Sequence, residues 1–203
     1  MRFDALIFDF DGVLIESEYI GNLHLAECLT ALGHPTTVED ALEKFVGLGG
    51  SDFLDAVAAW IGGNVPEAFH TARKAEDERV LREGLAEVCG AAAFVRSLRA
   101  DLPRAIASSS TTRWITTHLD HLGLRDAFEG RIFSGREHVT RGKPAPDIYL
   151  HAADALGVSI ARSAIIEDSL VGVTGAVASG AYVIGLAAGR HCADGHDATL
   201  LAK

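Results

Sequence analysis

The sequence is poor in cysteine, proline and basic residues. Its 203 residues include three cysteines and five prolines, and 18 Lys and Arg against 28 Asp and Glu give a net charge of −10. An odd number of cysteines without metal-ligand spacing argues against a disulfide framework or a zinc cluster. The acidic balance argues against nucleic acids and anionic membranes as partners, because non-specific binding to either needs clusters of Lys and Arg.

Long apolar runs are missing as well. The N-terminal segment MRFDALIFDFDG lacks the basic segment, long apolar run and cleavage site of a signal peptide, and no other stretch reaches the length of a membrane span. We therefore expect a cytoplasmic protein that is a monomer or a weak homo-oligomer. Apolar residues make up 48% of the chain, which is enough for a sizeable core.

The order of the apolar patterns predicts an α/β fold. A short apolar run at 5–8 is typical of a buried strand, and later strand-like runs alternate with helical stretches. The later runs lie at 105–107, 131–133, 164–166 and 182–186, and the helical stretches lie near 91–101, 112–122, 146–156 and 171–179. This alternation predicts a doubly wound, parallel, Rossmann-like sheet with crossover helices.

Between the first strand and the rest of the sheet, the apolar spacing is helical throughout. Thr36 with Glu39 resembles a capping box at the start of one of these helices. We therefore predict a core formed by residues 1–14 and 86–203, and a helical cap at 15–85 inserted after the first strand. The pattern at the end of the chain, Thr199-Leu200-Leu201-Ala202-Lys203, leaves the last edge of the core undefined.

Polar residues follow several of the predicted strands. In an open parallel sheet, ligands bind outside the carboxyl ends of the strands, so these residues are expected to share one crevice. They are Asp9 and Asp11 after the first strand, Ser108, Ser109 and Ser110 after the second, and Glu167 and Asp168 after the fourth, with Lys143 in a Gly-Lys-Pro loop. Each alone has a simpler explanation, such as a helix cap or a solvated side chain, but their shared position favours a site.

Acidic residues gathered at one crevice repel one another unless a cation lies among them. Mg²⁺ prefers oxygen ligands and is commonly held by one or two carboxylates together with a substrate phosphate. We therefore predict a Mg²⁺ ion bound by Asp9 and Asp168, with Glu167 close by and acting through water.

The remaining donors suit a phosphoryl group. The hydroxyl of Ser108, with Ser109 and neighbouring amides, and the ammonium group of Lys143 would bind its oxygens. A carboxylate can attack phosphorus to give an aspartyl phosphate, while a second acid protonates the departing alcohol and then activates water. We therefore predict Asp9 as the nucleophile and Asp11 as the acid and base.

Four segments, FDFDGVLIESE, IASSS, GKPAPDIY and IIEDSLVGV, resemble in order the four motifs of the haloacid dehalogenase-like hydrolases. The resemblance spans residues 8 to about 180. GKPAPDIY and EDSLVGV resemble the subgroup that contains β-phosphoglucomutase and many sugar-phosphate phosphatases. In that family a helical cap follows the first motif, at the place where the helical spacing begins here.

The resemblance implies a role for each matched residue. Asp9 would be phosphorylated, Asp11 would be the acid and base and bind the metal through its main-chain carbonyl, and Asp168 would be a Mg²⁺ ligand. Ser108 and Lys143 would hold the phosphate. Dehalogenases of this superfamily lack the second acid and the metal, so Asp11 and Asp168 indicate a Mg²⁺-dependent phosphatase acting on a small phosphorylated metabolite, such as a sugar or polyol phosphate.

The cap is less informative. Glu18 at its entrance and Lys74 or Arg73 on its last long helix are candidates for substrate contact, although such charges usually form a solvated helix face. The segment Gly47-Leu48-Gly49-Gly50 lacks the spacing of a dinucleotide loop and is interpreted as a helix end joined to a cap loop.

Aromatic and histidine residues are interpreted as structural. His118 and His121 share a helical face, but they lack the partners of a metal site, and all nine histidines, His191 included, are taken as structural or solvated. Trp60 and Trp114 lie at helical positions beside apolar neighbours, which favours packing over binding. The role of Trp114 stays open.

Two other functions are alternatives. A β-phosphoglucomutase-like phosphomutase shares the core motifs, but Gly21 and Gly50 stand where the mutase would carry a histidine and a phosphate-binding arginine. A phosphoacceptor signalling domain, or a metabolite-binding module, also places acids, a hydroxyl and a lysine at strand ends. The helical insert and the second acid, Asp11, argue against a signalling domain.

Overall fold

The computed structural model describes residues 3–46, 48 and 50–192, and these divide into two compact units. The first unit, here called the core, falls within Met1–Glu16 and Leu85–Lys203, and the second, the cap, is Ser17–Gly84. Gly47 and Gly49 of the predicted cap loop, and the predicted open edge at 199–203, lie outside the described residues.

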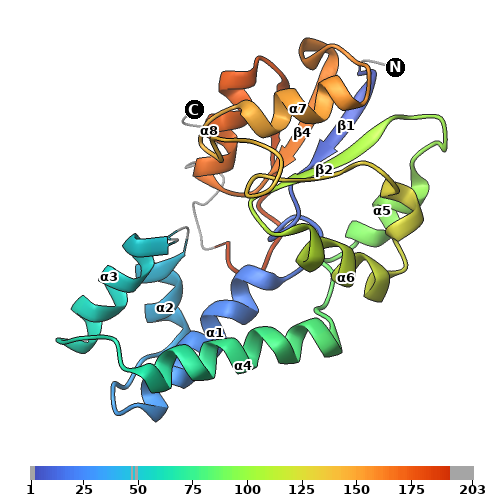
Figure 1. The fold of residues 1–203 in the computed structure, drawn as a ribbon. Helices are drawn as coiled ribbons and strands as arrows, with labels where there is room; N and C mark the ends of the chain where they lie inside the picture. The colour runs from blue at the N-terminus through green and yellow to red at the C-terminus, as the bar shows by residue number, and fades with distance from the viewer. Residues whose placement is uncertain (1–2, 47, 49, 193–203) are drawn as a thin grey trace. The chain divides into compact units, whose positions relative to one another are not determined.

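In the described part of the core, five parallel strands form a sheet in the order β3-β2-β1-β4-β5 (Figure 1). The strands are β1 (Ala5–Phe8), β2 (Arg104–Ser108), β3 (Ile132–Ser134), β4 (Ser163–Glu167) and β5 (Tyr182–Gly185). This arrangement confirms the predicted doubly wound parallel sheet. The first strand of the chain therefore lies at the centre of the sheet, between β2 and β4.

Helices cover both faces of the sheet, as Figure 1 shows. One face packs against α5 (Ala91–Ser97) and α6 (Thr112–Leu122), and the other against α7 (Asp147–Ala155) and α8 (Leu170–Ser179). Short 3-10 helices lie at Arg125–Phe128 and Ile160–Arg162. Because both faces are covered, β1 and β4 are buried along their whole length, which is why β1 is a continuous apolar run and β4 has one at its centre, at 164–166.

Helix α5 ends earlier than the sequence pattern predicts. The pattern continues to 101, but the helix stops at Ser97 and Leu98 is extended. The buried guanidinium group of Arg104 donates to the carbonyl oxygens of Val95, Arg99 and Leu102. These bonds satisfy carbonyls at and beyond the helix end that a longer helix would have used itself.

The described residues of the cap form four helices with an apolar core of their own. They are α1 (Ser17–Ala31), α2 (Val38–Phe45), α3 (Gly50–Ile61) and α4 (Glu67–Glu83). The predicted capping box at Thr36 and Glu39 was wrong by one residue: Thr37 caps α2 and pairs with Asp40. The hydroxyl of Thr36 instead donates to His34 O and accepts from the indole of Trp60.

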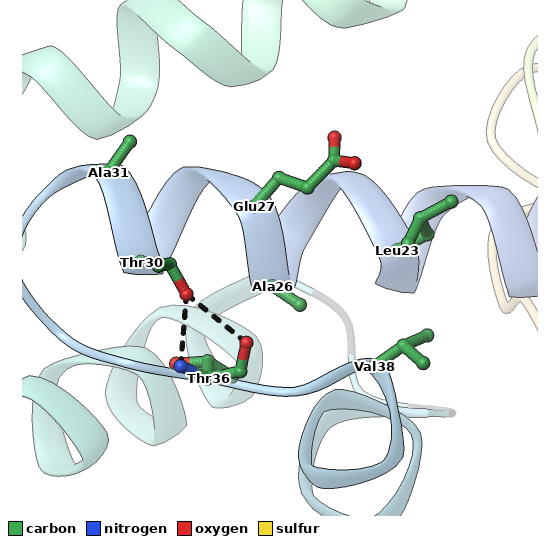
Figure 2. Close-up of a pocket in the computed structure, with 7 residues that line it drawn as sticks. All are labelled: Leu23, Ala26, Glu27, Thr30, Ala31, Thr36 and Val38. Carbon is green, nitrogen blue, oxygen red and sulfur yellow. Dashed lines mark hydrogen bonds between the residues drawn. The ribbon is translucent and has the colours of Figure 1, made fainter.

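Thr36 also joins α1 to the segment that precedes α2. Its amide donates to Thr30 Oγ1, and Thr30 Oγ1 donates to the carbonyl oxygen of Thr36, as Figure 2 shows. The same figure shows the pocket that these residues line together with Leu23, Ala26, Glu27, Ala31 and Val38. Of the helices in the described part of the chain, none has both the length and the apolar character needed to cross a membrane.

The corrected capping box gives a direct test within the cap. Thr37→Ala removes the side-chain acceptor for the amide of Asp40, so we expect α2 to lose about 1 kcal/mol of stability against local opening. Hydrogen exchange of the α2 amides measures this loss. The matched control is Thr71→Ala, at an exposed site within α4, where no loss is expected. Equal exchange in both variants would contradict the capping assignment.

Candidate active site

Lys143 lies between two acids at the carboxyl end of the sheet. Its Nζ donates to Asp9 Oδ1 at 2.6 Å and also to Glu167 Oε1, and all three side chains are almost completely buried. Asp9 follows β1 directly, and Glu167 ends the neighbouring strand β4. The aromatic ring of Tyr149, on α7, faces the ammonium group, with 5.2 Å between Lys143 Nζ and the ring centroid.

Glu167 is bound on both of its carboxylate oxygens. Tyr149 Oη donates to Oε1 at 2.6 Å, beside Lys143. Oε2 accepts from the amide of Asp168 and from the amide and hydroxyl of Ser169. A side chain at Gly172 would lie about 2.0 Å from this carboxylate, so α8 approaches Glu167 only because that position is glycine. The glutamate therefore serves as a fixed anchor for Lys143.

Burial shifts the proton affinities of this group. Burial and the neighbouring Glu167 raise the pKa of Asp9 well above its ordinary range, although Lys143 works in the other direction. Burial and Glu167 also raise the pKa of Asp168. Burial alone would lower the pKa of Lys143, but the carboxylates of Asp9 and Glu167 outweigh it and raise that pKa. The ammonium group of Lys143 thus compensates only part of the negative charge of the acids.

Asp9, Glu167 and Asp168 are placed so that a metal ion could be held among them. One carboxylate oxygen from each lies within 4.8 Å of the others, and all three are buried. Asp168 also contacts His191, whose Nε2 lies 2.9 Å from Asp168 Oδ2 and which is itself buried. Gly12, with φ of +73°, leaves room for Asp168, since a side chain there would lie 1.9 Å from Asp168 Oδ2.

Asp11 is held separately, by neutral donors. Its Oδ1 accepts from the indole Nε1 of Trp114 at 3.0 Å, and its Oδ2 accepts from Ser110 Oγ at 2.6 Å. Ser108 Oγ is 3.4 Å from Oδ2 and accepts from the amide of Ser110. The two acids of the first motif therefore lie in different surroundings, one beside an ammonium group and one among hydroxyls and an indole.

The structure brings most of the predicted site residues together in the core. Asp9, Lys143, Glu167 and Asp168 form one group of contacts, and Ser108 contacts Asp11 in a second group. Ser109 follows β2 as predicted but is exposed. Glu18 and Lys74 belong to the cap, on α1 and α4, where Glu18 is half-buried and Lys74 exposed. None of the predicted site residues lines the cap pocket of Figure 2.

Comparison with known proteins identifies the family. A model of the haloacid dehalogenase-like hydrolases matches residues 3–180. The chain belongs to this family. It is therefore a hydrolytic enzyme, and the four motifs read from the sequence are those of the haloacid dehalogenase-like hydrolases.

Relatives of this hydrolase include characterised and structurally solved proteins. It is 27% identical to the 6-phosphogluconate phosphatase of Escherichia coli, over 97% of this chain and 86% of the relative. A haloacid dehalogenase-like protein of unknown function from Agrobacterium tumefaciens has a TM-score of 0.88 and 32% identity, covering 98% of this chain and 90% of the other. A hydrolase of the family from Deinococcus radiodurans, solved with bound phosphate and sodium, has a TM-score of 0.79 and 33% identity, covering 91% and 80%.

Three contacts were missed by the sequence analysis. His191 was interpreted as structural or solvated, yet it contacts Asp168. The role of Trp114 stays open in the sequence, with packing favoured, and in the structure its indole donates to Asp11; Tyr149 donates to Glu167. The position of Trp114 in the first turn of the helix that follows the serines was an available signal, since that turn begins at the same sheet edge as Asp11.

Because α8 approaches Glu167 closely, we expect a change of glycine to alanine to lower the stability of the protein in α8 and to raise it in α1. Gly172→Ala should destabilise the protein by about 2 kcal/mol or more, because the new methyl group displaces a buried, fully bonded carboxylate. Gly21→Ala, in α1, adds a methyl group that meets no other atom within 4 Å, so it should stabilise by up to about 1 kcal/mol. Urea unfolding of the two variants measures both; stabilisation by both would contradict the position given to Glu167.

Because His118 is buried, we expect the protein to lose stability in mild acid. It is fully buried, and burial lowers its pKa from 6.5 to about 4. Between these values the unfolded chain binds the proton more tightly than the native protein. The contribution of neutral His118 to stability is therefore fully present above pH 6.5 and is lost as the pH falls toward 4. The native protein should lose about 3 kcal/mol more between pH 7 and pH 4 than His118→Leu.

Chemical unfolding at the two pH values gives this difference directly, and subtracting the variant removes the contributions of the acids that both proteins share. Thr71→Leu, at an exposed position of α4 that does not titrate, is the control and should keep the native pH dependence. A His118→Leu variant as acid-sensitive as the native protein would contradict the buried, neutral state of His118.

Proposed function

We propose that the protein is a Mg²⁺-dependent phosphatase that hydrolyses a small phosphorylated metabolite, a sugar or polyol phosphate, through an aspartyl phosphate on Asp9. The observation that carries the proposal is the buried group of Asp9, Lys143, Glu167 and Asp168 beside a separately held second acid, Asp11. A purely structural role would be filled better by apolar residues, because burying several charges costs free energy that imperfect pairing does not return.

The reaction runs in two halves. An Asp9 carboxylate oxygen attacks phosphorus, the bond from phosphorus to the ester oxygen breaks, and the departing oxygen takes a proton from Asp11. In the second half Asp11 takes a proton from water as the water oxygen attacks the phosphoryl group. The bond from phosphorus to Asp9 then breaks, and inorganic phosphate leaves. Lys143 holds a phosphoryl oxygen and offsets its charge, and Ser108 donates to another.

The donor set fits a hard divalent cation. Burial, and after it the neighbouring carboxylate of Glu167, raises the pKa of Asp9 and of Asp168, and oxygen ligands are those that Mg²⁺ prefers. Asp9, Asp168 and the main-chain carbonyl of Asp11 would hold the ion, while Glu167, with both oxygens engaged, keeps Lys143 in place. Bound there, Mg²⁺ would neutralise charge on the phosphoryl oxygens.

The substrate class is supported by the relatives and by the domain plan. The Escherichia coli relative is named a 6-phosphogluconate phosphatase, and the Deinococcus radiodurans relative was solved with phosphate. We propose that the cap, with Glu18 and Lys74, contacts the part of the substrate beyond the phosphate. The net charge of the protein, −10, repels an anionic substrate. The attraction therefore has to come from a bound cation and from Lys143.

The first test is release of inorganic phosphate from a panel of sugar, polyol and nucleotide monophosphates, with Mg²⁺ and with a chelator. We expect Mg²⁺-dependent release from the native protein and a loss of ~1000-fold or more in Asp9→Asn, because the amide is not a nucleophile. Mass spectrometry of the acid-quenched native enzyme should find a phosphoryl group on the peptide that contains Asp9.

Asp154→Asn, at an exposed position of α7, is the matched control and should keep native activity. Native-like turnover in Asp9→Asn would overturn the mechanism. Interconversion of hexose phosphates without phosphate release would instead support the phosphomutase alternative. No reaction with any phosphate ester would point to the binding or signalling alternative.

A further inference from the structure

We propose that Trp114 is a positioning residue that fixes the carboxylate of Asp11 for proton transfer to the leaving group, and that His118 holds Trp114 in place. This inference rests on the proposed function. The contact that carries it is the hydrogen bond from the indole Nε1 to Asp11 Oδ1, which joins the first motif to helix α6.

Trp114 is fixed at both its main chain and its side chain. Its amide donates to Thr111 Oγ1, the N-cap of α6, at 3.3 Å. One helical turn further on, the ring of His118 packs edge-on against the indole, with 4.3 Å between the ring centroids and 72° between the planes. His118 is fully buried and uncharged at neutral pH, because burial lowers its pKa to about 4. These contacts hold the indole so that its N–H points toward Asp11.

The chemistry of the indole decides which oxygen of Asp11 can carry a proton. An indole N–H is a donor only, so Oδ1 has to act as an acceptor toward Trp114 in either protonation state. A proton on Asp11 is therefore carried by Oδ2. The neighbour of Oδ2 is the hydroxyl of Ser110, at 2.6 Å, and a hydroxyl can both donate and accept. Trp114 thus orients the carboxylate with its proton-bearing oxygen on the side of the serines.

The arrangement is specific to the proton-transferring acid. Asp9 is held by the ammonium group of Lys143 and Asp168 contacts His191, whereas the contacts described for Asp11 come from neutral groups. The indole donor orients the carboxylate of Asp11 through Oδ1 and leaves Oδ2 beside the hydroxyl of Ser110. A packing role alone would not require the indole nitrogen to face the acid.

The test is the dependence of the reaction on the leaving group. Trp114→Phe keeps an aromatic ring and removes the N–H. We would measure kcat/KM with Mg²⁺ for 4-nitrophenyl phosphate, phenyl phosphate and the sugar or polyol phosphate that the native protein hydrolyses fastest. A nitrophenolate leaves without a proton, whereas an alcohol needs one. We expect a loss of ~10-fold or more for the alkyl ester, a smaller loss for phenyl phosphate, and less than about 3-fold for 4-nitrophenyl phosphate.

Two further variants separate positioning from general damage. In an Asp11→Asn background, Trp114→Phe should cost less than about 3-fold for every ester, because its effect acts through Asp11. Trp60→Phe removes an equivalent indole hydrogen bond in the cap, to Thr36, and should leave the leaving-group dependence unchanged. Equal losses for all three esters in Trp114→Phe, or losses that add in the double variant, would overturn the inference.

A spectroscopic measurement covers the case in which Trp114→Phe does not fold. The chain has two tryptophans, so Trp60→Phe leaves Trp114 as the only indole. In that protein, Asp11→Asn should shift the emission maximum, since it removes the anion from the indole N–H, whereas the control Asp154→Asn should not. An unchanged spectrum would overturn the inference. A native enzyme that releases phosphate from none of the esters would instead refute the proposed function, while the spectrum still reports the Trp114–Asp11 contact.

Discussion

The buried ammonium group of Lys143, shared by Asp9 and Glu167, is the interaction on which the rest of the core depends. A charge in a protein interior is tolerated only when it is paired and hydrogen-bonded, and removing one partner of a buried pair typically costs about 3–5 kcal/mol. Much of the surrounding structure serves this requirement. Tyr149 lies under the ammonium group, Ser169 binds the far oxygen of Glu167, and Gly172 lets α8 come close enough for its first turn to take part.

One consequence of this network is that two aspartates, two residues apart, have different properties. Asp9 at the end of β1 lies among charges, and burial with a neighbouring acid raises its pKa. Asp11 lies two residues further along, among two serines and an indole. Enzymes that use two carboxylates commonly distinguish them by environment. Here the partners come from different segments: Asp9 is bound by Lys143, from the loop between β3 and α7, whereas Asp11 is bound by Ser110 and Trp114, which follow β2.

The sequence allowed the sheet and most of the site to be predicted, because both follow from short-range signals. Buried parallel strands contain continuous apolar runs. The residues that follow such strands share one edge of the sheet, and this does not depend on the positions of the connecting helices. The contact between Trp114 and Asp11 could not be predicted with the same certainty, since a tryptophan beside apolar neighbours has the same pattern whether its nitrogen is used or not. The distance from His191 to Asp168 depends on how the chain turns after β5, where no sequence pattern defines the path.

Two predictions of helix ends were wrong because of contacts made by residues outside those helices. The capping box was placed at Thr36 because two adjacent threonines are each followed three residues later by an acid, and the spacing cannot choose between them. The choice is made by Trp60 and Thr30, which bind Thr36 from elsewhere in the cap and leave Thr37 to the helix. Helix α5 ends early where the guanidinium group of Arg104 adds a hydrogen bond to the carbonyl oxygens of Val95 and Arg99. In both cases a tertiary hydrogen bond decided between local alternatives of similar stability.

The place of β1 in the chain has a consequence for how the protein is made. It is the central strand of the sheet, yet its neighbours β2 and β4 begin only at Arg104 and Ser163. During synthesis the apolar segment ALIF therefore leaves the ribosome without a pairing strand, and the whole cap, which has its own apolar cluster, is completed before the first neighbour exists. Until β4 is added, the nascent chain carries an apolar strand that is not yet paired on both sides, and this is the interval in which a chaperone would protect it best.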